Sequence, residues 1–421
     1  LAACLDSVAT ACAGVADPVA VIVVVNGCER AAYDALVSRH RAVRWTFEPR
    51  PLGFGGAIAR GLAQVRHHWV YLLNSDMTLD PGALAALLPL RDARTFAVAS
   101  QIFLADPTRR REETGWTDFR IERFVTQHHD RTPEGDAVRG HLYAGGGASL
   151  FRTALLRRYA ARTRAYAPFY FEDADWGVQA AREGYAVKFC PASRAWHRHR
   201  ATIGRCYDPA EIARIVRRNG LLFEARHGFG GRARMLAGEP ASTRRELTTL
   251  ATLATTLRQR WRSRRARARG YSPELCCATW HPRRFDDARP TLLFAVRAAS
   301  PRPPVAGLPR FLAHAAAAQA EANLVLVIAQ PPGDPEPDAP SLEAFAAVHV
   351  VPVAAGNAGA GGPPAPPGGA DLFARQLTWW REVYRPAAVY AFPEAGDPDL
   401  LPARTGAPDS SAPRYATDST S

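Results

Sequence analysis

Apolar and polar positions alternate along the first half of the chain with two different periods. Short apolar runs between turn-forming residues predict strands, and apolar residues spaced three or four positions apart predict helices. The predicted strands are Val19–Val25, Val43–Phe47, Trp69–Leu73, Ala97–Phe103 and Ala186–Cys190. The predicted helices cover the opening residues, Arg30–Ser38, Ala57–Val65, Pro81–Leu88, a stretch from Thr153, a stretch ending at Gly184, and a stretch from Asp208-Pro209 to about residue 230. This alternation predicts an α/β domain over residues 1–230 with a mostly parallel central sheet.

Three further segments follow this domain. Residues 231–288 are predicted to form a basic helical linker, residues 289–395 a partial Rossmann-like α/β module, and residues 396–421 a disordered tail. In the module the pattern predicts strands at Thr291–Val296, Leu324–Ala329, Val348–Val353 and Ala387–Ala391, and helices at Leu308–Ala320 and Leu372–Tyr384. Two irregular segments, 104–140 and 356–369, have the composition of loops.

The composition limits the classes of partner. The chain has 421 residues with a formal charge of +13, but Lys188 is the only lysine among 53 basic residues, so the excess of arginine indicates GC-rich coding more than selection for nucleic acid. We expect no specific nucleic-acid partner. The seven arginines in Leu257–Gly270 surround Trp261 and leave two alternatives, a solvated linker helix or a helix in peripheral contact with an anionic membrane.

The seven cysteines show no CxxC spacing, which favours reduced thiols in a cytoplasmic protein. No secretory signal is predicted at the start of the chain, and no apolar run has the length of a membrane span. A structural zinc site is a minor alternative, formed by Cys190, His197, His199 and Cys206.

An acidic cluster is the clearest sign of chemistry. In Phe171-Glu172-Asp173-Ala174-Asp175-Trp176, three carboxylates crowd the start of a predicted helix. Mutual repulsion would raise their proton affinity, and we expect Asp173 to act as a general base with Glu172 and Asp175 beside it. Acidic residues also suit the first turn of any helix. The aromatic residues around the cluster favour a sugar-stacking cleft, with Trp176 and Trp196 as candidates for binding an acceptor.

A second acidic position lies where a predicted strand ends. Asp76 follows Tyr71-Leu72-Leu73-Asn74-Ser75, and ligands of open α/β sheets bind at the carboxyl ends of strands. Asp76 is a candidate ligand of a divalent cation, Mn²⁺ or Mg²⁺, with Asn74 orienting it and His197 completing the shell. The glycines of Leu52-Gly53-Phe54-Gly55-Gly56 precede a helix and suit an anion, although a tight turn explains them equally well. A dinucleotide site is disfavoured, because no ribose-binding acid follows at the usual place.

Residues 1–230 resemble family 2 glycosyltransferases with the GT-A fold, in the branch of rhamnosyl- and galactofuranosyltransferase-like enzymes. The resemblance runs in order through Leu52–Gly56, Leu73–Asp76, Gly145-Gly146-Gly147-Ala148 with Arg152, Phe171–Asp175, Gly184-Tyr185 and Trp196-His197. It implies an inverting transfer from a nucleotide-sugar donor, with Asp76 at the metal, Asp173 as base and His197 near the diphosphate. It also implies donor-binding roles for Asn26, Gly53, Gly55, Gly56, Asn74, Gly146 and Gly147.

The chain departs from this family in the nucleotide pocket. The family's first strand is absent, Val25 stands where an aspartate is usual, and Pro51 and Ala59 replace common asparagines. Residues 290–395 resemble, more faintly, the N-terminal half of a GT-B glycosyltransferase. The expected acceptor is a cell-surface polysaccharide such as lipopolysaccharide, or a lipid-linked glycan, at the inner face of a bacterial membrane. The alternative is a degenerate transferase that acts as a scaffold in polysaccharide assembly.

Overall fold

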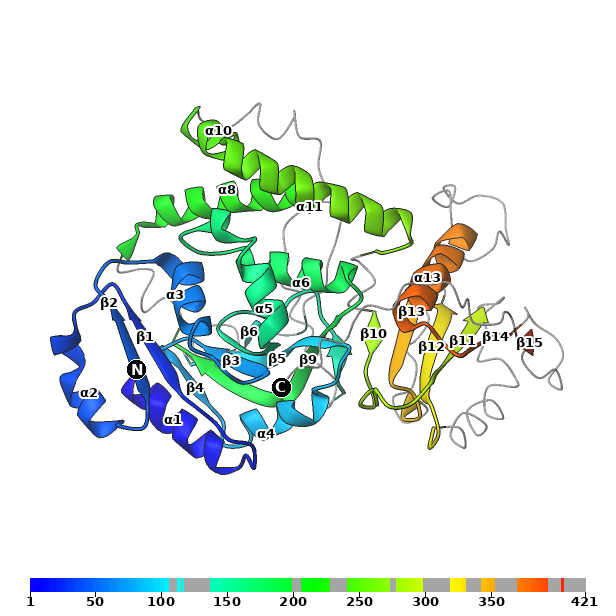
Figure 1. Cartoon of the computed structure of the whole chain (residues 1–421), viewed down its shortest axis with the longest axis horizontal. Helices are drawn as coiled ribbons and strands as arrows, with labels where there is room; N and C mark the ends of the chain where they lie inside the picture. The colour runs from blue at the N-terminus through cyan, green and yellow to red at the C-terminus, as the bar shows by residue number, and fades with distance from the viewer. Residues whose placement is uncertain are drawn as a thin grey trace. The chain divides into compact units, whose positions relative to one another are not determined.

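The computed structural model describes residues 1–105, 112–114, 116, 137–198, 206–227, 241–272, 278–297, 319–330, 342–352, 369–392 and 403–404. The chain divides into two compact units, Leu1–Phe285 and Asp286–Ser421 (Figure 1). Most of the predicted 104–140 loop, of the helix at 308–320 and of the 356–369 loop lies outside the described residues, as do His199 and the tail apart from Ala403–Arg404. In the described segments, no helix is long and apolar enough to cross a bilayer.

The first unit is built on a mixed sheet with the strand order β10-β7-β9-β5-β8-β3, while β4 pairs with β9 and β6 with β5. Its longest ladder, β5 on β9, is parallel, and most of the shorter ladders are antiparallel. A separate parallel pair joins β1 and β2. The bounds are β1 Ile22–Asn26, β2 Arg44–Glu48, β3 Trp69–Leu73, β4 Met77–Leu79, β5 Thr95–Leu104, β6 Glu112–Thr114, β7 Arg139–Gly140, β8 Ala148–Arg152, β9 Ala186–His197 and β10 Thr279–Trp280.

Helices cover both faces of this sheet, as the α/β prediction requires (Figure 1). The helices α1 and α4 pack on one face, and α3, α5 and α6 on the other, where α8 and α11 lie side by side outside them. The bounds are α1 Ala2–Ala13, α2 Asp34–Arg39, α3 Gly53–Leu62, α4 Ala83–Leu87, α5 Thr153–Ala160, α6 Glu172–Arg182, α8 Pro209–His227, α10 Ala241–Leu247 and α11 Leu250–Ala268. Within the segment 231–288 that was predicted as a helical linker, the described residues form α10, α11 and the short strand β10, and α11 packs on α8 within the first unit.

Two of the differences from the predicted bounds bear on the candidate site. The helix α3 begins at Gly53, four residues earlier than predicted, so the glycine cluster lies in its first turn. The strand β9 continues past Cys190 to His197, because a bulge opposite Ser100/Gln101 lets the ladder resume with alternating buried and exposed residues. The α/β class is confirmed. The mostly parallel character holds for the longest ladders, β5–β9 and β11–β12.

The second unit has strand order β15-β14-β11-β12-β13, in which only the β14–β15 ladder is antiparallel. The first four strands of this unit are therefore arranged 4-1-2-3, which in reverse is the beginning of the Rossmann strand order 3-2-1-4-5-6. This agrees with the predicted Rossmann-like module. The bounds are β11 Thr291–Arg297, β12 Asn323–Gln330, β13 Ala347–Pro352, α13 Gly369–Tyr384, β14 Ala388–Phe392 and β15 Ala403–Arg404.

A close approach of backbones fixes the position of α6. A Cβ added to Gly177 would lie 2.2 Å from the carbonyl oxygen of Leu142. We expect Gly177→Ala to lower the free energy of unfolding by about 1–3 kcal/mol or more, because backbone must move. Gly55→Ala in α3 is the matched control, since no atom lies within 4 Å of its added Cβ, and it should gain up to about 1 kcal/mol of helix propensity. Urea unfolding of both variants checks this; equal stabilities would contradict it.

Candidate functional site

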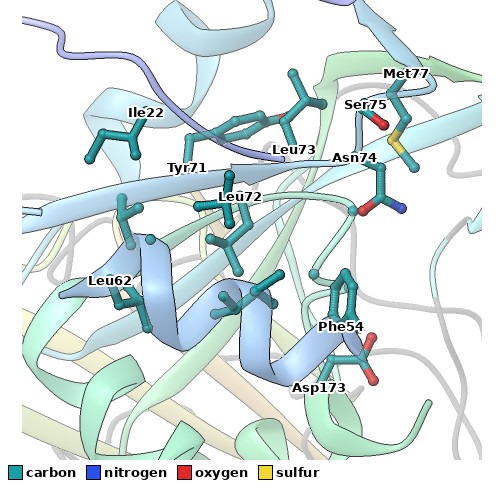
Figure 2. A pocket seen from close by; sticks show the side chains of 18 of the residues that line it. Ile22, Phe54, Leu62, Tyr71, Leu72, Leu73, Asn74, Ser75, Met77 and Asp173 are labelled. Atoms are coloured by element: carbon teal, nitrogen blue, oxygen red, sulfur yellow. The ribbon is translucent and has the colours of Figure 1, made fainter. Parts of the chain in front are cut away.

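A cavity of about 2520 Å³ lies in the first unit beside the carboxyl ends of β1 and β3. Its other walls come from α1, α3, the loop 145–147, the start of α6 and α8. Figure 2 shows Phe54 of α3, Asn74 and Asp173 among the residues that line it. Within the described residues, β1 pairs only with β2 and β3 only with β8, so both strands that line the cavity keep one edge without a strand partner. Apart from the buried Val25, their apolar side chains consequently remain only partly buried.

Asp76 and His197 meet at one end of this cavity. The β4–β9 ladder places Met77 opposite His197, and Asp76 Oδ1 lies 3.3 Å from His197 Nε2. The Asp76 carbonyl also accepts a hydrogen bond from Arg198 N, 3.0 Å away. A carboxylate and an imidazole fit two positions of a Mn²⁺ or Mg²⁺ shell whose other positions are filled by phosphates and water. Among the described residues, no group of three or more His, Cys, Asp or Glu side chains is arranged to hold a metal by itself.

The glycine loop connects this end of the cavity with the acidic cluster. Asn74 N donates to Gly147 O at 2.8 Å. A Cβ on Gly147 would lie 3.0 Å from Asn74 Nδ2, and one on Gly146 would lie 2.7 Å from the Phe54 ring. The amide of Gly146 donates to the carboxylate of Asp173. A side chain at either position would displace neighbouring side chains, and the loop holds Asn74 and Asp173 on the same cavity.

Asp173 and Glu172 begin α6, and both line the cavity. Asp173 Oδ1 accepts from Ala174 N at 2.8 Å. Burial raises the pKa of Asp173, although the amides of Ala174 and Gly146 oppose this effect. Burial, followed by the neighbouring Asp173 carboxylate, raises the pKa of Glu172 well above its usual value. The two carboxyls thus have raised proton affinity as predicted, with burial as the larger cause.

A strained turn presents these carboxylates, and its support was not predicted. Tyr170 and Phe171 both have φ of 73°, a left-handed conformation that is unfavourable for aromatic residues. The buried Asn219 of α8 stabilises the turn, because its Nδ2 donates to the carbonyls of Phe169 at 2.8 Å and Tyr170 at 3.0 Å. From sequence, Asn219 is a lone polar residue in an amphipathic helix, a signal too weak to identify it.

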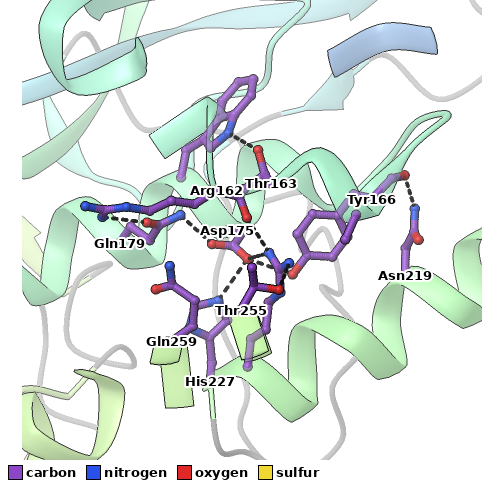
Figure 3. A network of polar contacts seen from close by, with 12 residues as sticks. Arg162, Thr163, Tyr166, Asp175, Gln179, Asn219, His227, Thr255 and Gln259 are labelled. Atoms are coloured by element: carbon purple, nitrogen blue, oxygen red, sulfur yellow. Dashed lines mark hydrogen bonds and ion pairs between the residues drawn. The ribbon is translucent and has the colours of Figure 1, made fainter. Parts of the chain in front are cut away.

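The structure corrects the assignment of Asp175. Its side chain has no solvent exposure and does not line the cavity. Figure 3 shows it inside a polar network, where it accepts from Tyr166 Oη at 2.7 Å, Gln179 Nε2 at 2.7 Å and Arg226 Nη1 at 3.1 Å. Burial by itself would raise the pKa of Asp175, but His227 and Arg226 beside it hold that pKa well below its usual range. Because helical periodicity turns Asp175 away from Asp173, it is a buried anion and makes no contact with the cavity.

The two tryptophans predicted to bind an acceptor also lie elsewhere. Trp176 has 0% exposure and belongs to the core, where its Nε1 donates to Thr163 Oγ1 at 2.9 Å. It has no surface to offer an acceptor. Trp196 is 40% exposed but is not part of the cavity wall; its ring stacks on Phe103 with centroids 5.0 Å apart, and its Nε1 donates to Asp80.

The predicted donor-binding residues fall into two groups. Asn26, Gly53, Asn74, Gly146 and Gly147 line the cavity, whereas Gly55 and Gly56 do not. Asn26 holds the turn before α3, because its Oδ1 accepts from Leu52 N at 2.7 Å and its Nδ2 donates to Gly53 O at 3.3 Å. Gly53 has φ of 70° and lies so near Pro168 that an added Cβ would be 2.8 Å from its carbonyl oxygen.

Comparison with solved structures finds glycosyltransferases at low identity. GalNAc-T7 with UDP, GalNAc and Mn²⁺ aligns with a TM-score of 0.39 at 12% identity over 54% of this chain, which spans about half (47%) of that protein. Staphylococcus aureus TarS 1–349 aligns with a TM-score of 0.37 at 13% identity, over 63% of this chain and 78% of the TarS chain. The mannosyltransferase PcManGT of Pyrobaculum calidifontis, in complex with GDP-Man and Mn²⁺, aligns with a TM-score of 0.34 at 16% identity. The alignment covers 63% of this chain and 68% of PcManGT.

No curated protein matches the chain. A family model does. The model described as glycosyltransferase like family 2 covers residues 1–218, just over half of the 421 residues, and includes Asp76, the glycine loop, the acidic cluster and His197. The chain therefore belongs to the glycosyltransferase-like family 2.

Proposed function

We propose that the first unit is a nucleotide-sugar glycosyltransferase of the GT-A type that acts by inversion. The observation that carries this proposal is the meeting of the Asp76–His197 pair, the 145–147 loop and Asp173 on one cavity. An anion site and a base site are the two requirements for transferring a sugar from a nucleoside diphosphate to a hydroxyl.

The chemistry is a single displacement. Asp173 accepts the proton of an acceptor hydroxyl as its oxygen bonds to the anomeric carbon, and the bond from that carbon to the diphosphate oxygen breaks. Asp76 and His197 would hold a divalent cation, which supplies positive charge for the leaving diphosphate. The glycine loop gives close approach to the donor, and Asn26, Gly53 and Asn74 line the remaining wall.

The finer assignments follow from the sequence motifs. We assign the donor sugar to the hexoses or deoxyhexoses, in line with the rhamnosyl- and galactofuranosyltransferase-like motifs. The acceptor is a hydroxyl of a surface polysaccharide or lipid-linked glycan, at the cytoplasmic face of a bacterial inner membrane. The resemblance of the second unit to half of a GT-B enzyme stays a prediction.

The metal assignment predicts a specific loss of affinity. Asp76→Ala should weaken Mn²⁺-dependent binding of a nucleoside diphosphate at least tenfold in calorimetry, because one of two protein ligands is removed. Asp80→Ala is the matched control, since Asp80 lies nearby but contacts Trp196 outside the cavity wall. An affinity unchanged by Asp76→Ala would remove this residue from the metal site.

The raised pKa of Asp173 predicts the acid limb of the rate profile. A base works only when deprotonated, so transfer should decline with falling pH at a pH above the ordinary aspartate pKa of about 3.9. Measurement of kcat from pH 4 to 8 on saturating donor, at about 25 °C, would show it. If the fall in kcat on the acid side of the profile occurred only at or below the ordinary aspartate pKa, burial would not be raising the pKa of the catalytic carboxyl.

The scaffold alternative makes the opposite prediction for ligands. If the cavity binds donor, Mn²⁺ together with a nucleoside diphosphate should raise the melting temperature, and neither alone should do so fully. No shift over a range of nucleotides would favour the scaffold.

A further inference from the structure

The helix α11 is oriented with its polar side inward. Its buried residues include Thr256, Gln259 and Ser263, each 4% exposed or less. Figure 3 shows Gln259, together with the neighbouring Thr255, beside the buried polar network around Asp175. Arg182 of α6 donates to Gln259 O at 3.3 Å and to Ser263 Oγ at 3.1 Å. In most surface helices the buried face is apolar, whereas three of the four buried residues of α11 are polar.

The outward side of α11 carries large apolar side chains. Leu250 is 88% exposed, Leu257 54% and Trp261 58%. Their spacing of seven and four residues places all three on one line along the helix. Single exposed apolar residues are common on protein surfaces, but three aligned along a helix of 19 residues form a continuous stripe.

Positive charge borders this stripe. Arg258, Arg264 and Arg265 are exposed beside it, and the Arg265 guanidinium lies 5.4 Å from the centroid of the Trp261 ring. Between Glu246 and Glu274 the sequence contains no acidic residue. A stripe of leucine and tryptophan flanked by arginines matches an anionic bilayer surface, where the apolar side chains enter the acyl boundary and the arginines meet phosphates.

We propose that α11 docks the protein on the surface of an anionic membrane. The charge and the apolar stripe must act together, which favours lipid over nucleic acid, since nucleic acid gives no partner to Leu250 and Leu257. The docking itself is argued from α11 alone. Its role, to bring the cavity to a lipid-linked acceptor, rests on the proposed function.

The docked helix is connected to the cavity through α8. Ile212, Val216 and Gly220 of α8 line the cavity. Near its end, Arg226 Nη2 donates to Thr255 Oγ1 of α11 at 3.5 Å, and His227 Nδ1 lies 3.3 Å from Ser263 Oγ. One helix therefore forms a cavity wall and anchors the membrane-facing helix, which would hold the cavity near the lipid surface.

Sedimentation of the full chain with lipid vesicles tests the proposal. Binding to phosphatidylcholine vesicles containing phosphatidylglycerol should exceed binding to pure phosphatidylcholine and should fall with salt. The double variant Leu257→Gln, Trp261→Gln should bind at least tenfold more weakly, because the residues that insert are gone. Arg258→Gln with Arg264→Gln should lose about fivefold for each charge removed.

The matched controls separate this surface from general attraction. Arg41→Gln with Arg50→Gln removes the same charge from exposed positions outside α11, and Trp196→Gln removes an exposed tryptophan elsewhere. Both should bind vesicles like the parent chain. Three results would each overturn the proposal. The Leu257/Trp261 variant could bind vesicles like the parent chain, the control variants could lose as much binding as the α11 variants, or the chain could bind an oligonucleotide but not vesicles. Because this assay needs neither donor nor cation, its failure would leave the proposed transferase activity untouched, and a failed transferase assay would leave vesicle binding intact.

Discussion

Asp173→Asn is expected to lower the rate of sugar transfer by about 10²–10⁴-fold, the usual contribution of a general base. Asparagine has nearly the same shape, and its Oδ1 can still accept the hydrogen bond of Ala174 N, so α6 should begin as before. It cannot accept the acceptor proton at neutral pH. The affinity for a nucleotide sugar, measured by calorimetry with Mn²⁺, should therefore remain within about twofold of the parent value, since the lost interaction acts in the transition state.

The neighbouring carboxylate gives the control for this experiment. Glu172→Gln changes the same chemical group one residue away and should retain far more activity, because only Asp173 is assigned the proton. Equal losses in the two variants would show that the cluster acts as a unit. Loss of donor binding in Asp173→Asn would count against its role as base and would favour a role in holding the donor.

Asp175→Ala is expected to lower the free energy of unfolding by about 3–5 kcal/mol, the usual result of removing one partner from a buried ion pair. Arg226, whose side chain is 1% exposed, would keep its charge without the carboxylate 3.1 Å away. Tyr166 and Gln179 would lose an acceptor as well. Asp6→Ala is the matched control, because its pair with Arg39 at 2.9 Å is about half exposed and should contribute less than about 1 kcal/mol.

The depressed pKa of Asp175 also determines how the stability lost on replacing its carboxylate depends on pH, for which the isosteric Asp175→Asn is the variant to compare with the parent. Its folded pKa lies below the unfolded value of about 3.9, so its contribution is fully present above that value and is lost as the pH falls through the folded pKa. The gap in stability between the parent and Asp175→Asn should therefore narrow as the pH is lowered from 7 toward 3 in urea unfolding. A gap that is small and constant with pH would mean that the ion pair contributes little.

Local patterns along the chain were enough to predict the order of most elements and the family. The period of the apolar residues is a local property, so strands such as Trp69–Leu73 and helices such as α6 were predicted near their observed bounds. Asp76 and Asp173 were identified because each stands where a strand ends or a helix begins. These places open onto ligands in α/β proteins.

Which side chains of each element face the cavity could be seen only in the folded chain. Asp173 and Asp175 differ by two positions in one acidic run, yet one lines the cavity and the other is buried against Arg226. Trp176 lies in the core, Asn219 supports the turn before α6 from a helix nearly 50 residues away, and α11 turns its polar side inward. The physical reason is that such roles depend on partners distant in the chain, and the charge or polarity of a residue gives no sign of which partner it will meet.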